Sequence, residues 1–335
     1  MPYMPALDGI RAIAIMLVLL FHADVPVFPG GNLGVDVFFV LSGFLITRLL
    51  LLEWYASGRL DTRRFYWRRI WRLMPPLLVL LALYAIAAPL IWPDYPFHLR
   101  DGLMTLLYLG NLGAAFGYTP SQLLHGWSLA VEEQFYLLWP LLLLGAFRLR
   151  LPLWQSLLLI YVLMNLWRCW ALFGLGIPTG VAYFRPDIHS SGLVLGGVVA
   201  ASIGRGDKRH VPRWLFWPCC LMGALAVLWP RSDVAHLAFF VPVTELCVAG
   251  VLLWLLAYPD DAGGRWLAGT PLVMVGKLSY GLYLYHFPLM KALQLGAWGW
   301  PVTLLFGSAG ALLLATLSYH FVEQPAKRYR LGRYT

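Results

Sequence analysis

Asp8, Arg11 and His22 interrupt the first long apolar stretch of the sequence, residues 7–23. An ionisable side chain at membrane depth is costly and is by default a sign of function. At 3.6 residues per turn, Arg11 and His22 project from one helix face about 16 Å apart, and Asp8 precedes Arg11 by one turn. A snorkelling Arg11 and an interfacial His22 are the structural alternative. The stripe predicts an imidazole placed for acid–base chemistry.

Two carboxylates enter a second apolar stretch, HGWSLAVEEQFYLLWP at residues 125–140. Adjacent residues on a helix diverge by about 100°, so only Glu132 or Glu133 can face His22 squarely. A carboxylate beside an imidazole fixes its tautomer and stabilises its charged form, which is what a general base needs. Asp36, at the outer start of another apolar stretch, is a further candidate. A structural pairing of Glu133 with a tryptophan N–H or a helix-end amide is the alternative.

The segment RRFYWRRIWRLMPP, residues 63–76, is the most basic part of the chain. Its arginines at 64, 68, 69 and 72 repeat at helical spacing. A basic amphipathic helix on the inner leaflet, with arginines on lipid phosphates, is the ordinary explanation. The alternative is a grip on a phosphorylated cytosolic ligand, for which the guanidinium fork is well suited. The sequence leaves both open.

Composition sets the class of protein. The chain has 335 residues, of which 60% are hydrophobic and 12% charged, and its mean hydropathy is +0.69. These values exclude a soluble domain and predict a polytopic membrane protein in contact with lipids. No repeat or low-complexity linker divides the chain, so we expect a single domain over residues 1–335. The four cysteines show neither disulfide nor metal spacing, and we expect no metal, no bound cofactor and no nucleic-acid partner.

Hydropathy and loop charge predict the topology. Candidate spans fall at residues 7–23, 33–52, 73–92, 102–116, 127–147, 152–172, 188–204, 214–230, 237–257, 273–295 and 302–322. The stretch 102–116 is short and interrupted by Gly110, Asn111 and Gly113, which favours a re-entrant or interfacial piece. Without it, the basic segments at 59–72, 205–213 and 327–333 share the cytoplasmic side. We therefore predict an all-α bundle of about ten transmembrane helices with both termini cytoplasmic.

Several motifs in order carry a resemblance. They are the Arg11 and His22 spacing, GVDVFFVLSGFLIT at 34–47, FYWRRIWRLMP at 65–75, WSLAVEEQFYLLWP at 127–140 and SYGLYLYHFPL at 279–289. Together they resemble the family-3 membrane acyltransferases over nearly the whole chain. The resemblance implies a bacterial inner-membrane enzyme that O-acylates, usually O-acetylates, cell-surface or exported glycans. It also implies acetyl-CoA as the usual donor, and essential roles for His22 and Arg11.

Geometry and resemblance together predict roles. We expect His22, oriented by Glu132 or Glu133 and Asp36, to remove the proton from a sugar hydroxyl that attacks the thioester. The expected donor-binding residues are Arg11, Arg64, Arg68, Arg69, Arg72, Tyr280 and His286, and the expected acceptor-binding residues are Trp127, Ser128 and Asp187.

Two alternatives stay open in the sequence. An acyl-enzyme on His22 or Ser128 competes with direct transfer. A transporter that relays protons through buried Arg, His and Glu is the second class of function. It lacks evident inverted repeats, and it would leave the basic segment at 63–76 unused. Acceptor identity and acyl chain length are not predicted.

Overall fold

The structure, a computed structural model, describes residues 3–203, 211–229 and 233–332. Within these ranges the chain forms helices and turns without any strand, so the predicted all-α class is confirmed. The α-helices are α1 (Pro5–His22), α2 (Gly34–Ser57), α3 (Thr62–Ile91), α4 (His98–Leu106), α5 (Gly110–Ala115), α6 (Gly126–Arg148), α7 (Leu153–Cys169), α8 (Thr179–Ala182), α9 (Ser191–Ser202), α10 (Phe216–Leu228), α11 (Asp233–Ala235), α12 (Val241–Ala257), α13 (Ala262–Leu267), α14 (Thr270–Leu295), α15 (Trp300–Ser318) and α16 (Gln324–Gly332). The 3₁₀ segments are Gly31–Leu33 and Arg213–Leu215, and the π segments are Trp170–Gly174, His236–Phe240 and Tyr319–Glu323.

Seven helical segments of the described chain are long and apolar enough to cross a membrane. They are Pro5–His22, Gly31–Ser57, Thr62–Ile91, Gly126–Arg148, Leu153–Gly174, His236–Ala257 and Trp300–Tyr329. The three other predicted spans are also helical, as α9, α10 and α14, but α9 has only 12 residues and α10 only 13. The 26-residue α14 is long enough but interrupted by polar side chains. The polytopic class is confirmed, and the count of ten spans stays a prediction.

The segment predicted to stop short of a span forms two short helices. α4 and α5 together cover residues 98–115, and Tyr108 between them has a left-handed backbone with φ of 54°. A bulky residue at positive φ ends a helix, because that conformation cannot continue the α ladder. This break is why residues 102–116 do not form one transmembrane helix.

The basic segment and the span that follows it are one helix. The Asp61 side chain caps α3 by accepting the backbone N–H of Arg64 at 2.8 Å, as N-cap carboxylates do. From there the helix runs through Pro75 and Pro76 for 30 residues. The basic segment, which the sequence puts outside the predicted span at 73–92, is therefore the first part of the same helix, and its arginines are rigidly joined to that span.

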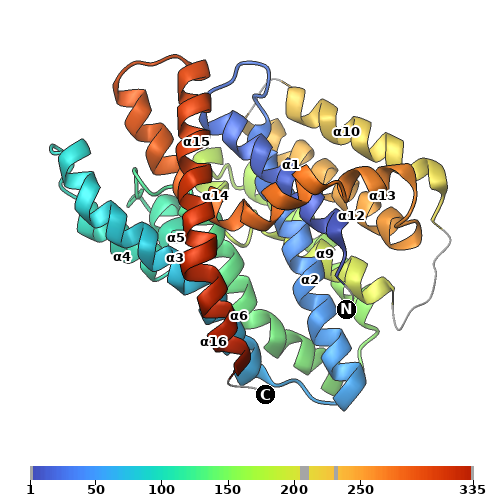
Figure 1. The fold of residues 1–335 in the computed structure, drawn as a ribbon. Coiled ribbons are helices and arrows are strands. Elements are labelled where there is room, and N and C mark those ends of the chain that lie inside the picture. The colour runs from blue at the N-terminus through green and yellow to red at the C-terminus, as the bar shows by residue number, and fades with distance from the viewer. Residues whose placement is uncertain (1–2, 204–210, 230–232, 333–335) are drawn as a thin grey trace. The chain divides into compact units, whose positions relative to one another are not determined.

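The chain divides into two compact units, and it passes between them several times. The first unit holds residues 1–21, 26–60 and 131–277. In it, α2 and α9 lie side by side (Figure 1). A Cβ on Gly43 would overlap the backbone carbonyl of Leu193, and one on Gly196 would overlap that of Val40. Glycine at these positions therefore lets the two backbones meet.

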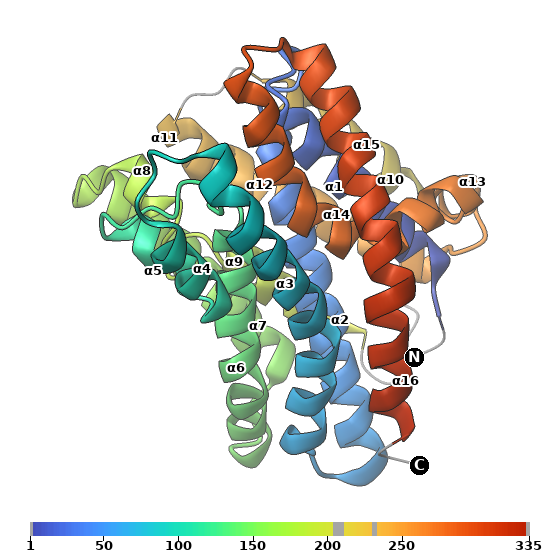
Figure 2. The same ribbon diagram turned by 60° about the vertical axis from the view of Figure 1, so that its left-hand side comes forward.

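The second unit holds residues 22–25, 61–130 and 278–335. Here α4 packs beside α3, and the α15 to α16 run forms one continuous helical rod (Figure 2). Gly281 of α14 faces Ala315 of α15, where an added Cβ would lie about 3.0 Å from that side chain. The ring of Tyr329 on α16 lies 4.6 Å from that of Trp71 on α3. These contacts fix α14 and α3, which carry several predicted site residues.

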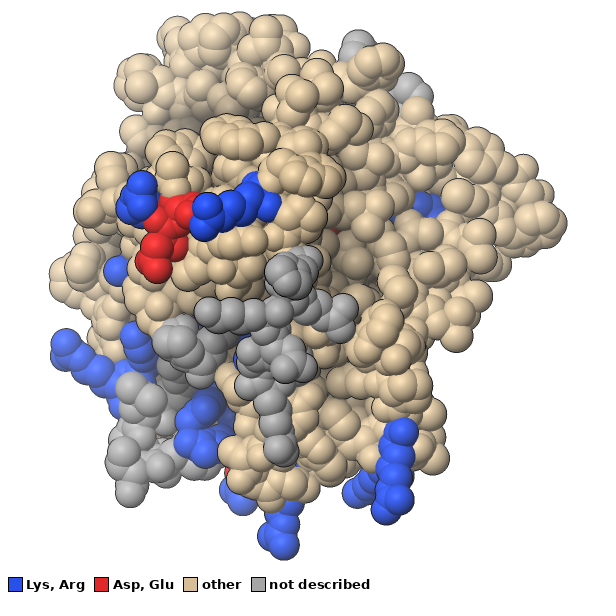
Figure 3. Space-filling model, turned by 90° about the vertical axis from the view of Figure 1, so that its right-hand side faces the viewer, with Lys and Arg blue, Asp and Glu red and all other residues tan. Residues whose placement is uncertain are grey.

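Charge is sparse on the outside of the protein. Figure 3 shows a face on which most side chains are neither Lys, Arg, Asp nor Glu, with the acidic ones gathered beside basic ones. Many large apolar side chains of the spans are exposed, among them Leu90, Leu138 and Leu159. Contiguous apolar surface of this kind requires a nonpolar solvent, which a lipid bilayer provides.

Candidate active site

His22 is the last residue of α1, and its backbone is tied to α14. The amide nitrogen of Gln294 donates to the carbonyl oxygen of His22 at 3.1 Å and to Oδ2 of Asp24 at 3.0 Å. Asp24 has a left-handed backbone, φ 59°, which turns the chain away after the helix. The last carbonyls of a helix lack intrahelical partners, so Gln294 satisfies one of them and fixes the position of His22.

The His22 ring lies against a second histidine. Its Nδ1 is 3.0 Å from Nε2 of His286, which is completely buried on α14. The ring of Phe287 meets the His22 ring edge-on, with centroids 5.0 Å apart. The sequence predicts His286 as a donor-binding residue, and that role stays a prediction. The structure gives it a contact with His22, the predicted base.

A third histidine and two hydroxyls continue this cluster. The His125 ring stacks on Phe287 at 4.9 Å and lies 5.6 Å from His286. The hydroxyl of Tyr283 donates to the carbonyl of His125 at 2.7 Å, and its oxygen is 2.6 Å from Oγ of Ser128. Because the phenolic hydrogen is used on the carbonyl, Ser128 is the donor in the second bond. We call His22, His125, Tyr283 and His286 the histidine cluster.

Sequence reasoning missed two residues of this region. His125 opens the motif that contains the paired glutamates, and Gln294 lies two turns beyond His286 on α14. His125 is 2% exposed, so its burial separates it from an ordinary loop histidine. The sequence signal that could have found it is that His125 lies only two positions before the WSLAVEE segment. Nothing in the sequence singles out Gln294.

The carboxylates expected to orient His22 have other partners in the structure. Oε2 of Glu132 accepts from Oγ of Ser42 at 3.1 Å and from the hydroxyl of Tyr136 at 2.7 Å. Oδ1 of Asp36 lies 3.0 Å from Nε2 of His189. These carboxylates belong to the first compact unit and His22 to the second. Orientation of His22 by Glu132, Glu133 or Asp36 therefore stays a prediction.

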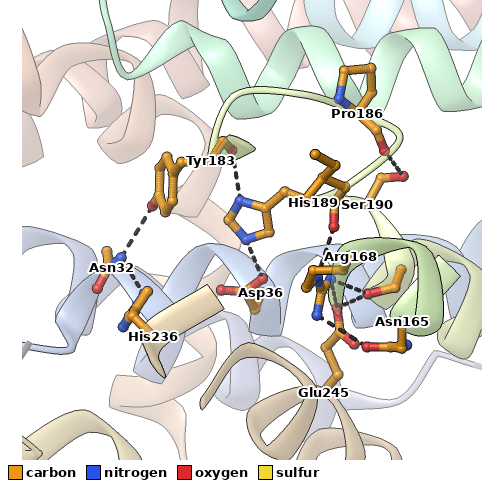
Figure 4. A network of polar contacts seen from close by, with 12 residues as sticks. Asn32, Asp36, Asn165, Arg168, Tyr183, Pro186, His189, Ser190, His236 and Glu245 are labelled. Atoms are coloured by element: carbon orange, nitrogen blue, oxygen red, sulfur yellow. Dashed lines mark hydrogen bonds and ion pairs between the residues drawn. The ribbon is translucent and has the colours of Figure 1, made fainter. Parts of the chain in front are cut away.

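Figure 4 shows Asp36 within a larger buried polar network of the first unit. Arg168, fully buried, donates to the carbonyl of Ile188 at 2.8 Å and to Ser191 at 2.6 Å, and its Nη2 lies 3.8 Å from Oε1 of Glu245. Arg168 and Glu245 therefore form a buried ion pair. Every one of these contacts joins helices to one another or to a loop, which points to a structural role.

The first half of the α1 stripe forms as predicted. Oδ1 of Asp8 pairs with Nη1 of Arg11 at 3.1 Å, and the hydroxyl of Tyr3 donates to Oδ2 of Asp8 at 2.7 Å. The Arg11 side chain keeps 21% of its surface exposed. Its charge is thus paired but still accessible.

The arginines of the basic segment lie along the first turns of α3. Arg68 and Arg72 are exposed, whereas Arg64 and Arg69 are partly buried. Tyr280, predicted beside the donor, donates from its hydroxyl to the carbonyl of Leu73 at 2.8 Å. Tyr280 therefore links α14 to α3 directly after these arginines.

The predicted acceptor-binding residues lie in different places. Trp127 is 5% exposed and Ser128 is bound in the histidine cluster. Asp187 lies in the loop before α9, where Arg185 binds both its oxygens at 3.0 and 2.7 Å and Trp167 donates at 2.9 Å. Burial alone would raise the pKa of Asp187, but these donors hold that pKa below its ordinary value.

A pocket of about 760 Å³ lies in the first unit between α1, α10, α12 and α13. Its lining is apolar, with Trp217 and Trp266 on the exposed side and Leu33 and Leu267 on the buried side. Besides the indole N–H groups of these two tryptophans, the polar side chains among the described lining residues are thiols and the hydroxyl of Thr244, and none of them is charged. A phosphorylated ligand would lose its hydration there without gaining a charged partner, so this pocket does not suit the CoA phosphates.

The geometry can now be set beside known proteins. The apolar helices and the family match over most of the chain together define the class, which is that of the membrane acyltransferases. The chain belongs to the family whose model is described as "Acyltransferase domain", which matches residues 4–320. The family predicted from the motifs is therefore confirmed.

The curated proteins that the chain resembles include O-acetyltransferases of three bacteria. The chain is 28% identical to the peptidoglycan O-acetyltransferase OatA of Listeria monocytogenes and 32% identical to the putative peptidoglycan O-acetyltransferase YrhL of Bacillus subtilis. It is 28% identical to the O-acetyltransferase OatA of Staphylococcus aureus. Each alignment covers 97% of this chain but only 55–57% of the relative, so the chain spans about half the length of the relatives it matches. No solved structure matches it.

Proposed function

We propose that the protein is a membrane O-acetyltransferase that moves an acetyl group from acyl-CoA to a hydroxyl of a cell-surface or exported glycan, with His22 as general base. Family membership supports acyl transfer. The printed names of the relatives favour acetyl as the group and a peptidoglycan-like glycan as the acceptor. The observation that carries the proposal is His22 itself, an imidazole fixed at the end of a membrane helix by Gln294 and His286.

The proposed step is direct transfer. The glycan hydroxyl oxygen attacks the thioester carbonyl carbon while His22 takes its proton, so that a C–O bond forms as the C–S bond breaks. The proton then passes from His22 to the thiolate of CoA, and the enzyme is regenerated. A positioned base of this kind contributes about 10²–10⁴-fold to rate.

The competing acyl-enzyme on Ser128 is less well supported. A serine nucleophile needs a neighbouring base to take its proton. Oγ of Ser128 instead donates to the hydroxyl of Tyr283, whose own proton is held by a backbone carbonyl. Neither of these groups is a base that could take the proton of the Ser128 hydroxyl, and this favours direct transfer.

For the donor side, we propose two separate candidates for binding the CoA phosphates, which are Arg11 on α1 and the guanidinium groups at the start of α3. Acetyl-CoA is cytosolic, and the predicted topology puts both ends of the chain and the basic end of α3 in the cytoplasm. His22 lies about 16 Å further along the same helix as Arg11. In a bacterial cytoplasmic membrane, the pantetheine arm would span that distance to reach an acceptor on the outer side.

The test is acetyl transfer by purified protein in liposomes. With acetyl-CoA and a soluble peptidoglycan fragment, we expect release of free CoA thiol and an O-acetylated product seen by mass spectrometry. The His22→Gln variant should lose at least about 10²-fold in rate, and His320→Gln, an exposed histidine on the π segment before α16, should not. Full activity of His22→Gln would remove the mechanism. Substrate uptake without any thiol release would favour the transporter alternative.

A further inference from the structure

The hydrogen bonds of His286 leave its ring only one neutral protonation state. Its Nδ1 lies 2.8 Å from the carbonyl oxygen of Tyr283 and 3.1 Å from that of Leu282. A carbonyl oxygen only accepts, so Nδ1 must carry the hydrogen. In the neutral ring, Nε2 then holds the lone pair and acts as an acceptor.

This state determines the tautomer of His22. Nε2 of His286 lies 3.0 Å from Nδ1 of His22. Two acceptor nitrogens facing each other repel, so Nδ1 of His22 must supply the hydrogen. A neutral imidazole has one N–H, and the lone pair of His22 is therefore on Nε2.

We propose that His286 is a positioning residue that holds His22 in the tautomer with its lone pair on Nε2, the nitrogen that takes the proton from the acceptor hydroxyl. The proposal rests on the proposed function, because the value of this tautomer depends on His22 acting as a base. It reassigns His286 from donor binding to orientation of the base. In this arrangement the imidazole of His286 accepts the hydrogen bond from His22, a role that a carboxylate has in other enzymes.

The surroundings of the two rings keep the pair in place. His286 is completely buried, and Phe287 fixes the His22 ring from the side. Gln294, about two turns further along α14 than Phe287, holds the backbone of His22. One helix thus supplies the acceptor, the ring contact and the backbone clamp.

Among the described residues, the titratable and charged groups next to these rings are His125, Tyr283, Asp24 and Lys291. The His125 ring is 5.6 Å from His286, with its Nε2 on the carbonyl of Leu284 at 3.1 Å. Tyr283 donates to a carbonyl, Asp24 accepts from Gln294, and the Lys291 ammonium lies 5.6 Å from the Phe287 ring. Among these described contacts, the hydrogen bond that selects the His22 tautomer comes from His286.

The experiment compares two substitutions of similar size. His286→Phe keeps an aromatic ring but removes the acceptor, whereas the amide oxygen of His286→Gln reaches about as far as Nε2 and can still accept. We expect kcat of His286→Phe to fall about 10²-fold with the KM for acetyl-CoA within about twofold, and kcat of His286→Gln to stay within about tenfold of the unchanged protein. The acid limb of the pH profile should move to lower pH in His286→Phe, because a donor without its acceptor makes the imidazolium of His22 harder to form. In His286→Gln the acid limb should lie at the same pH as in the unchanged protein. His320→Gln is the control for a histidine lost elsewhere.

A second measurement does not depend on activity. ¹⁵N NMR of histidine-labelled protein in nanodiscs, with the His22 signals assigned by their loss in His22→Gln, distinguishes protonated from unprotonated ring nitrogens. We expect a protonated Nδ1 and an unprotonated Nε2 on His22. The opposite tautomer would overturn the proposal even if the protein transfers acetyl groups, and so would equal kinetics of the Phe and Gln variants. Loss of acetyl transfer in the unchanged protein, with the expected tautomer present, would instead contradict the proposed function. If His286→Phe does not fold, the NMR result on the unchanged protein decides.

Discussion

Asp36 and His189 form a buried hydrogen-bonded pair that joins α2 to the loop before α9. Nε2 of His189 lies 3.0 Å from Oδ1 of Asp36, and its Nδ1 lies 2.8 Å from the carbonyl oxygen of Tyr183 (Figure 4). Both ring nitrogens thus face acceptors, although a neutral imidazole has a single N–H. The Asp36 carboxylate and the Tyr183 carbonyl therefore hold the His189 ring from both sides.

This pairing predicts that Asp36 acts on stability. Asp36→Ala removes the carboxylate that His189 contacts in a buried site, and loss of one partner of a buried hydrogen bond costs about 1–3 kcal/mol. We expect a lower Tm in detergent, with kcat per folded molecule within about threefold of the unchanged protein. Asp36→Asn, which keeps an oxygen acceptor, should lose less. A normal Tm together with a kcat lowered 10²-fold would return Asp36 to the role predicted from the sequence, as an orienter of His22.

The sequence predicts the helices and the contacts within one helix, but not the contacts between helices that are far apart in the chain. Helix positions follow from hydropathy, and the Asp8 to Arg11 pair follows from helical periodicity, because both depend on residues near each other in the chain. The contacts of Asp36, His286 and Gln294 depend on helix pairs far apart in sequence, whose rotation about their axes hydropathy does not fix. A carboxylate was therefore the natural expectation beside His22. A histidine 264 positions away in the sequence is what the structure puts there.

The paired glutamates are expected to differ in role. Oε2 of Glu132 is held by Ser42 of α2 and by Tyr136 one turn later, so Glu132→Ala should lower Tm by removing a buried acceptor worth about 1–3 kcal/mol. Glu133 diverges by about 100° on the same helix. If it orients a base, Glu133→Gln should lower kcat about 10²-fold at unchanged Tm.

The measurements are kcat for acetyl transfer and Tm for each single variant. Glu132→Gln, which preserves an accepting oxygen for Ser42 and Tyr136, is the matched control for Glu133→Gln. A larger kcat loss in Glu132→Gln than in Glu133→Gln would reverse the assignment.

Asp187 gives a pH dependence of stability whose sign can be worked out. Its pKa in the folded protein lies below the ordinary Asp value because Arg185 and Trp167 donate to it, against the opposing effect of burial. A lowered folded-state pKa stabilises the fold fully above the unfolded value, about 3.9, and that stability is lost as pH falls through the folded value. Arg185→Met should therefore lower Tm at pH 6, and its difference from the unchanged protein should shrink toward pH 3.

Tm measured between pH 6 and pH 3 in detergent tests this expectation. Asp187→Asn is the matched background, since Arg185→Met should have little further effect once the carboxylate is gone. A Tm difference that is independent of pH would mean that Arg185 stabilises the loop by packing and not through the Asp187 charge.

The arginines of α3 offer the sharpest test of the donor side. Arg68 and Arg72 are exposed on the first turns of that helix, and a hydrogen bond from a charged group is worth about 1.5–3 kcal/mol. If they bind CoA phosphates, Arg68→Gln and Arg72→Gln should each raise the KM for acetyl-CoA by about 10–100-fold with kcat little changed. The same variants should behave as the unchanged protein with S-acetyl pantetheine, which carries the thioester without phosphates.

The charge-matched control is Arg63→Gln, because Arg63 is an exposed arginine of the same helix outside the predicted donor set. An equal rise in KM for both donors would show that the substitutions disturb the pantetheine path. An unchanged KM with weaker binding of the protein to anionic lipid would assign these guanidinium groups to the membrane surface, because lipid phosphates and CoA phosphates compete for the same side chains.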